Sequence, residues 1–302
     1  SEQSNALQKI FVKNVKTNTE EEIKFVDEKV IVPGVSLIQR DKNTDLVRLS
    51  YSSPKTQARV YEYNLKTKEK KLVKEQEIPS GHNSEDYIVE RLECKSHDGR
   101  VVPITITRHK KTKINGSANL LLYGYGSYGS SMSPGFSSTR LSLINRDIIW
   151  VTAHIRGGME RGMKWWKEGK LLNKKNTFED YIAVAKFLIE KKYTSNGKII
   201  GMGGSAGGLL MGAVVNQAPK LFLGIIMAVP FVDSLTTNLD HSLPLTVGEF
   251  EEFGNAKKNK EHFEYIYSYA PYNNIKKMDY PHMFITTSLS DNRVLFDEPL
   301  KF

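Results

Sequence analysis

The spacing of apolar residues divides the chain into two regions. From Ile10 to Ile78, short runs of alternating apolar and polar residues, such as 47–51 and 61–65, are separated by polar turns. A period of two residues with turns at this spacing predicts the antiparallel strands of an all-β unit. At roughly 40–50 residues for each four-stranded propeller blade, this region holds about one and a half to two blades, too few to close a ring.

From about Asp86 the pattern changes to strands that alternate with amphipathic helices. Continuous apolar runs predict strands in a sheet interior at 119–123, 148–151, 198–202, 224–229 and 283–287. Helical spacing predicts helices at 177–193 and 206–215, and Thr177 with Asp180 resembles a capping box at the start of the first. This alternation predicts an α/β fold with a mostly parallel sheet covered on both faces.

A glycine-rich turn at the junction of strand 198–202 and helix 206–215 is the candidate catalytic segment. Residues 203–207 read G-x-S-x-G, with Ser205 at the centre. A buried strand, a tight turn and a helix, in this order, are what a nucleophile elbow requires. Such a turn directs the N–H of Ala206 toward the oxygen of a tetrahedral intermediate, where each donor contributes about 3–4 kcal/mol. A glycine-rich phosphate loop or a plain tight turn is the alternative, but a Walker A motif is excluded because no lysine follows the glycines.

A serine nucleophile needs a histidine as general base and a carboxylate that orients it, and in this fold they follow the serine in the order Asp, His. Asp291 follows the predicted strand 283–287 and is the candidate acid. All seven histidines precede it, and His154 and His282 lie where packed histidines are expected. The sequence therefore predicts a chain that lacks its general base.

The net positive charge of the chain suggests that it could bind nucleic acid, but the distribution of its lysines disfavours this hypothesis. The 302 residues hold 43 Lys and Arg against 34 Asp and Glu, a formal net charge of +9. The densest basic runs, 66–71 and 108–113, fall between strand-like segments, where solvated turns are expected. No aromatic residues interleave with them as a nucleic-acid interface would need, so no nucleic-acid partner is predicted.

Cysteine content and hydropathy indicate a cytoplasmic protein. Cys94 is the single cysteine, which excludes an intrachain disulfide and a cysteine-based zinc cluster and fits a reducing compartment. The longest apolar stretch, 224–232, is far shorter than the roughly 18–20 residues of a membrane span. The polar first six residues lack the apolar core of a signal peptide. No membrane association is therefore expected.

Six segments carry a specific resemblance to a known family: Leu122–Tyr128, Ile155–Gly158, Lys175–Phe178, Gly203–Gly208, Val229–Asp233 and Leu243–Glu252. Together they resemble the oligopeptidase B branch of the prolyl oligopeptidase family of serine peptidases, from about Asp45 to the last residue. The resemblance implies an α/β-hydrolase domain capped by a seven-bladed β-propeller. It further implies hydrolysis of short peptides after Lys or Arg through an acyl-enzyme, without metal or cofactor.

The resemblance assigns catalytic roles to four positions. Ser205 matches the nucleophile and Asp291 matches the triad acid. Tyr125 matches the tyrosine whose hydroxyl joins the amide of Ala206 in the oxyanion hole. The family's histidine comes some tens of residues after the acid, in a loop that this chain does not reach.

Three further positions match residues that bind substrate. Glu249 and Glu251 match an acidic pair that receives the basic P1 side chain, and Arg293 matches an arginine that binds the substrate backbone. Physical chemistry supports the glutamates independently, because a cationic side chain that leaves water needs a carboxylate partner. An ordinary solvated acidic helix face is the alternative for the glutamates.

The resemblance also implies a division of the chain. Residues 1–83 correspond to the C-terminal blades of the propeller, and residues 84–302 to a peptidase domain without the part that carries the histidine. We therefore expect a fragment or the product of a shortened gene, with little activity of its own. The alternative functions are a non-catalytic remnant that binds peptides or a partner through open sheet edges, and an ordinary esterase, which the glutamates disfavour.

Overall fold

The computed structural model describes residues 2–25, 28–37 and 44–302, so residue 1, residues 26–27 and residues 38–43 of the expected N-terminal unit lie outside the described residues. The N-terminal unit is antiparallel, as the alternation predicts. Its largest sheet contains, in sequential order, β5 (Val32–Leu37), β6 (Leu46–Ser52), β7 (Arg59–Asn64) and β8 (Lys70–Glu75). Two hairpins precede it, formed by β1 (Glu2–Ser4) with β2 (Leu7–Lys9) and β3 (Phe11–Asn14) with β4 (Thr19–Glu22). Ile10, Ile23, Leu49 and Tyr63 form its small buried core.

The basic runs lie partly in turns, as expected, and partly in the strands next to them, since Lys70 and Lys71 belong to one strand and Arg108 and His109 to another. Lys66 and Lys68 are in the turn between β7 and β8, where they pair with Asp45 and Glu21, each at 2.7 Å. Arg108 lies near the end of β10 (Val101–His109), the second strand of the larger unit, and pairs with Glu90 at 2.7 Å. Much of the positive charge in these runs is therefore balanced locally.

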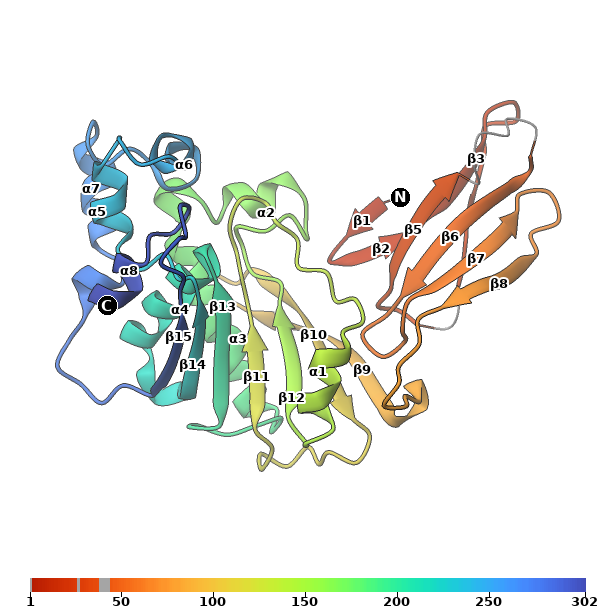
Figure 1. Cartoon of the computed structure of the whole chain (residues 1–302), viewed down its shortest axis with the longest axis horizontal. Coiled ribbons are helices and arrows are strands. Elements are labelled where there is room, and N and C mark those ends of the chain that lie inside the picture. Colours follow the sequence, from red (N-terminus) through yellow and green to blue (C-terminus); the bar gives the residue numbers. More distant parts are fainter. Residues whose placement is uncertain (1, 26–27, 38–43) are drawn as a thin grey trace.

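A mixed seven-stranded sheet forms the larger unit, and Figure 1 shows it at the centre of the molecule. Its strand order is β15-β14-β13-β11-β12-β10-β9. The five predicted strands are parallel neighbours: β11 (Leu120–Tyr123), β12 (Ile149–Ala153), β13 (Ile199–Gly204), β14 (Phe222–Ala228) and β15 (His282–Thr286). The hydrophobic pattern did not predict the antiparallel hairpin that extends the sheet, β9 (Tyr87–Lys95) with β10 (Val101–His109).

Helices cover the sheet and border one end of it. The sheet helices are α1 (Ser138–Ile144), α3 (Lys175–Glu190) and α4 (Ala206–Gln217), and Figure 1 shows α1 in front of β12 and α3 behind the sheet. Beyond the carboxyl ends of β13–β15 gather α5 (Ser234–Leu239), α6 (Thr246–Phe253), α7 (Lys260–Tyr267) and α8 (Asp297–Lys301). Short connections complete the chain: η1 (Ser84–Asp86), α2 (Met163–Lys167), η2 (Leu171–Asn173), η3 (Pro219–Leu221) and η4 (Tyr272–Asn274). No helix of the described residues is long and apolar enough to cross a membrane.

The capping-box prediction for α3 was wrong. The helix starts at Lys175, so Thr177 and Asp180 lie inside it, and both are fully buried. The Asp180 carboxylate accepts two hydrogen bonds from the guanidinium of Arg156, at 2.9 and 2.6 Å, while Thr177 donates to the Arg156 carbonyl at 3.0 Å. These residues therefore tie α3 to the segment that follows β12.

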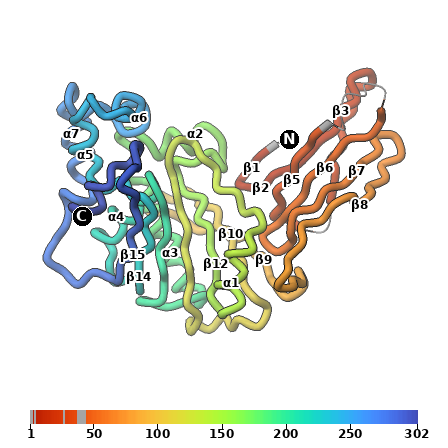
Figure 2. Tube along the Cα trace, in the orientation of Figure 1, coloured from red at the N-terminus to blue at the C-terminus, as the bar shows by residue number. Residues whose placement is uncertain are grey.

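The two units meet through the first hairpin and the segment before β9. The Ala6 N–H donates to the carbonyl of Glu160 at 2.8 Å, and the Asn5 amide donates to Glu93 at 2.8 Å. The predicted division between residues 83 and 84 falls in the connection from β8 to β9, which the tube in Figure 2 shows as the covalent link between the units.

Candidate active site

Ser205 occupies a strained corner between β13 and α4. Its φ of 56° and ψ of −121° are unusual for a residue with a side chain, and strain of this kind persists only where neighbouring contacts enforce it. The Ser205 N–H donates to the carbonyl of Ala228 on β14 at 2.9 Å, and the Ser205 carbonyl accepts from Gly208 and Phe231 at 2.8 and 3.1 Å. The corner therefore has the backbone geometry of a nucleophile elbow.

Glycines are required around this corner because backbone segments approach closely. A Cβ on Gly203 would lie 2.2 Å from the carbonyl oxygen of Gly207, and one on Gly208 would lie 2.3 Å from the Cα of Pro230. Neither contact can be relieved by rotating a flexible side chain. The glycines of the motif thus allow α4 to begin directly against the segment that follows β14.

Gly208→Ala is expected to lower the free energy of unfolding by about 2–3 kcal/mol, because α4 must move away from Pro230 to accept the methyl group. Urea unfolding followed by circular dichroism measures this change. Gly248→Ala on α6 is the matched control, since a Cβ there meets no atom within 4 Å and alanine favours the helix. Equal unfolding midpoints for the two variants would contradict this account of the elbow.

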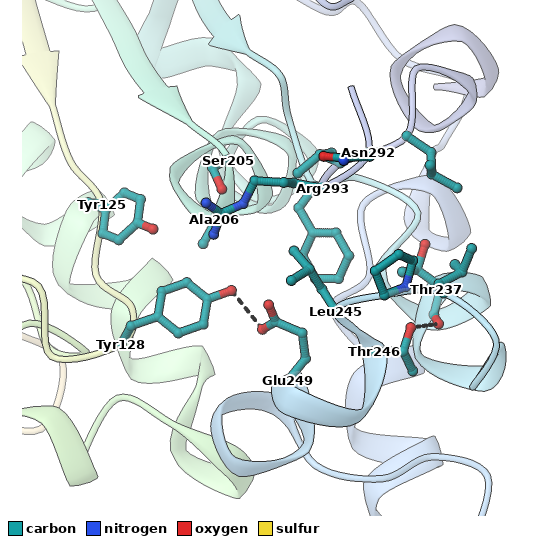
Figure 3. A pocket seen from close by; sticks show the side chains of 15 residues that line it. Tyr125, Tyr128, Ser205, Ala206, Thr237, Leu245, Thr246, Glu249, Asn292 and Arg293 are labelled. Carbon is teal, nitrogen blue, oxygen red and sulfur yellow. Dashed lines mark hydrogen bonds between the residues drawn. The ribbon is translucent and has the colours of Figure 1, made fainter. Parts of the chain in front are cut away.

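Two candidate oxyanion donors lie next to Ser205. Ala206 is the first residue of α4, so its N–H belongs to the unpaired first turn, where the helix dipole favours negative charge. Tyr125 follows β11, and its phenol points into the same space as the Ser205 hydroxyl in Figure 3. Burial raises the pKa of Tyr125, and its interaction with the Ser205 side chain opposes this in part. The phenol therefore remains a proton donor at neutral pH.

A pocket of about 190 Å³ opens beside Ser205. Its lining includes Tyr125, Tyr128, Phe231 and the segments 243–246 and 292–295. Glu249 is the one carboxylate among these lining residues. Figure 3 shows its side chain directed toward the same space as the Ser205 hydroxyl and the two tyrosines.

The Glu249 carboxylate is oriented by Tyr128, whose hydroxyl donates to Glu249 Oε2 at 2.7 Å. Burial raises the pKa of Glu249; the Tyr128 hydrogen bond opposes this rise, the carboxylate of Glu252 adds to it, and the charge of Arg293 lowers it. Burying a carboxylate without a matched cation is costly. A cationic group that entered the pocket would stabilise the ionised form of Glu249.

The other predicted substrate ligands lie in different places. Arg293 lines the pocket. Glu251 does not, because it projects from another face of α6 with 78% of its side chain exposed, and it pairs with Lys170 at 3.3 Å. The structure thus brings Ser205, Ala206, Tyr125, Glu249 and Arg293 together around one pocket and leaves Glu251 outside it.

Asp291 lies in the loop after β15, beside the pocket-lining segment but not in the pocket lining itself. Its Oδ1 accepts hydrogen bonds from the N–H groups of Arg293 and Val294, at 2.8 and 3.1 Å. The carboxylate thereby holds the turn that presents Arg293.

The described residues that line the pocket include no histidine. His154 is fully buried and packs as expected, with Nε2 at 2.8 Å from the Thr105 hydroxyl. The prediction that His282 is packed was wrong, because it is exposed at the start of the edge strand β15.

The sequence assigns no role to Tyr128 and Lys174, and to Glu252 it assigns only a share, with Glu249 and Glu251, in a local negative field that would attract basic substrates. Tyr128 and Glu252 lie inside family-like segments, and Lys174 lies just before one. Their hydrogen bonds join segments that are far apart in the chain, so no local pattern reveals them. The isolated positive φ of Tyr128, 58°, is a property of the folded loop alone.

Comparison with known proteins decides the family. Residues 134–302 match the sequence profile of the Prolyl oligopeptidase family. The chain belongs to this family. Dipeptidyl aminopeptidase BI of Pseudoxanthomonas mexicana is 42% identical over 100% of this chain and 41% of that protein, and protease 2 of Moraxella lacunata is 44% identical over 88% of this chain and 38% of that protein.

Solved structures of the family agree with the fold. Oligopeptidase B from Trypanosoma brucei, in a closed form with covalently bound antipain, has a TM-score of 0.91 at 38% identity, and oligopeptidase B from Leishmania major has 0.89 at 36%. Both alignments cover 98% of this chain and 42% of the other. This member of the prolyl oligopeptidase family thus spans about two fifths of the length of the relatives it matches, and its larger unit has the fold of their α/β-hydrolase domain.

Proposed function

We propose that this chain carries the nucleophile, the oxyanion hole and the P1 pocket of a serine peptidase that cleaves short peptides after Lys or Arg. The observation that carries the proposal is the position of Glu249. It is the one carboxylate among the residues lining a pocket that opens at a strained nucleophile serine. A lysine or arginine side chain in that pocket would neutralise Glu249 and bring the following peptide bond next to Ser205.

The proposed chemistry is acyl transfer. Ser205 Oγ bonds to the peptide carbonyl carbon, and the Ala206 N–H and Tyr125 O–H stabilise the resulting oxyanion. Collapse breaks the C–N bond, the amine leaves with the proton that the general base took from Ser205, and an ester remains on Ser205, which water then hydrolyses. The serine proton needs a general base, and we propose that none of this chain's seven histidines supplies it. Without that base, turnover falls by about four to six orders of magnitude.

Peptide selectivity tests the proposal without requiring turnover. N-acetylated peptide amides with arginine, lysine, norleucine or glutamate at the P1 position are titrated against the chain in a calorimeter. Arginine and lysine peptides are expected to bind at least about tenfold more tightly than the norleucine peptide, which matches lysine in length but is neutral. Equal affinities for lysine and norleucine would overturn the proposal.

The same titration also distinguishes cleavage inside short peptides from an alternative function, the release of dipeptides from a free N-terminus. The match to a dipeptidyl aminopeptidase, 42% identical over all of this chain and 41% of that protein, favours recognition of a free peptide N-terminus. A dipeptide amide with a free amino group is therefore compared with its acetylated form. Tighter binding of the free form would assign the site to release of dipeptides, and tighter or equal binding of the acetylated form supports cleavage inside short peptides.

A further inference from the structure

The loop that connects Tyr125 to Tyr128 has a strained backbone. Gly126, Tyr128 and Gly129 have φ angles of 73°, 58° and 66°, so a residue with a side chain is held in the left-handed region between two glycines. Such a conformation persists only where surrounding groups over-determine it. The loop carries a proposed oxyanion donor at one end and the phenol that orients Glu249 at the other, so whatever holds it affects both.

Lys174, the residue immediately before α3, binds this loop through hydrogen bonds of its ammonium group. Its side chain is 1% exposed, and its ammonium group donates to the Gly126 carbonyl at 2.6 Å and to the Ser127 hydroxyl at 2.7 Å. A third acceptor, Oε1 of Glu252, lies 3.8 Å away. The three donors of an ammonium group thus face three oxygens, two of them in the loop.

Glu252 holds the same loop from the side of α6. Its carboxylate is 3% exposed and accepts the Tyr128 N–H at 3.0 Å on Oε1 and the indole N–H of Trp166 at 2.8 Å on Oε2. Glu249 stands three residues earlier on the same helix, and residues at this spacing share a helix face. The pair of Lys174 and Glu252 therefore connects α3, the loop and the helix that presents Glu249.

We propose that Lys174 and Glu252 are positioning residues that fix Tyr125 beside Ser205 and Glu249 inside the pocket as one unit. The inference rests on the proposed function, since it assigns the support of the same site. Loss of the Lys174 charge would release the loop from α3, and the loop could then relax its strained backbone. The oxyanion donor and the P1 carboxylate would both lose their placement.

The titration of Lys174 gives this unit a pH dependence. Burial lowers the pKa of Lys174 to about 8, while Glu252 and Glu249 on α6 oppose that shift. From the loop, the Tyr128 phenol is the titratable group on the other side of Glu249. Deprotonation removes one donor and the attraction to Glu252. The positioning effect should therefore be largest well below pH 8 and should weaken as the pH rises through about 8.

The test compares Lys174→Met, which keeps the length of the side chain but removes its charge, with Lys175→Met. Lys175 is the next residue, but it is exposed and its ammonium lies over the ring of Tyr265. Three quantities are measured: hydrogen exchange of the peptide containing Tyr128, the rate at which a fluorophosphonate modifies Ser205 with imidazole present, and the Kd of an arginine peptide. Lys174→Met is expected to speed exchange at least about tenfold, slow modification about tenfold to a hundredfold and raise Kd about threefold to tenfold. Lys175→Met should stay within about twofold of the unmodified chain in all three.

The pH dependence of Ser205 modification shows whether Lys174 positions the site or only stabilises the fold. The ratio of the modification rates of the unmodified chain and Lys174→Met is expected to fall above about pH 8. A Lys174→Met chain that only melts earlier, with all three readouts unchanged well below its melting temperature, would overturn the inference. If Lys174→Met does not fold, Glu252→Gln carries the test with the same readouts, since it keeps the volume and one acceptor. An unmodified chain that neither reacts at Ser205 nor binds arginine peptides would instead overturn the proposed function. The inference about Lys174 and Glu252 would then fall with it.

Discussion

A fluorophosphonate is expected to form one covalent adduct with this chain when imidazole is present, and Ser205→Ala is expected to abolish it. Ser205 Oγ bonds to phosphorus, the P–F bond breaks, fluoride leaves, and imidazole from solution takes the serine proton. The phosphoryl oxygen, which carries a partial negative charge, would occupy the space between the Ala206 N–H and the Tyr125 phenol. The adduct is measured by the mass of the intact chain and located by peptide mapping.

Ser290→Ala is the matched control for that experiment, because Ser290 is an exposed serine in the loop beside Asp291. It should leave the adduct unchanged in amount and rate. Without imidazole, Ser205→Ala should have little effect on peptide hydrolysis, because triad members act as a unit and, on the proposed function, none of this chain's histidines serves as the base. Rapid arginine-peptide hydrolysis without imidazole, lost in Ser205→Ala, would contradict the proposal that the base lies outside this chain.

Local patterns predicted the elbow well because everything that defines it is close in sequence. A buried strand, glycines where backbones touch and an apolar helix all lie within about twenty residues of Ser205. The same is true of the parallel strands, whose continuous apolar runs reflect burial on both faces. These local patterns therefore sufficed to place Ser205 at the carboxyl end of β13.

Features that depend on distant partners were missed or misassigned. Thr177 and Asp180 have the residue types of a capping box. Instead, Asp180 accepts hydrogen bonds from the buried guanidinium of Arg156, and Thr177 donates to the Arg156 carbonyl, in the segment that follows β12. His282 begins a strand, yet that strand is the sheet edge in the described chain, so the ring is exposed. In both cases a tertiary arrangement overrides a local preference.

The acidic segment 249–252 shows the same limit at the site itself. The resemblance paired Glu249 with Glu251, but residues two apart on a helix face different directions, whereas residues three apart are neighbours. On α6, Glu249 consequently faces the pocket with Glu252 behind it, and Glu251 faces Lys170 and solvent. A role for Glu251 in binding the P1 side chain stays a prediction, which a pair of variants can test.

Glu249→Gln is expected to weaken binding of an arginine peptide by about 2–3 kcal/mol, roughly thirtyfold to 150-fold in Kd, and to leave a norleucine peptide almost unaffected. The amide keeps the volume of the side chain and a partner for the Tyr128 hydroxyl, but it removes the charge that pairs with the guanidinium. Calorimetric titration of both peptides against both chains measures the change.

Glu251→Gln provides the matched control, because it makes the same chemical change two residues away on an exposed face. It should change the arginine-peptide Kd less than about threefold, as an exposed charge outside the pocket is well screened. Burial raises the pKa of Glu249, so arginine binding should weaken as the pH falls and this carboxyl takes up a proton, at a higher pH than an ordinary glutamate would require. Glu249→Gln should bind with the same affinity across that range. If instead Glu251→Gln causes the larger loss, both carboxylates or Glu251 alone must reach the substrate, and the pocket would have to rearrange on binding.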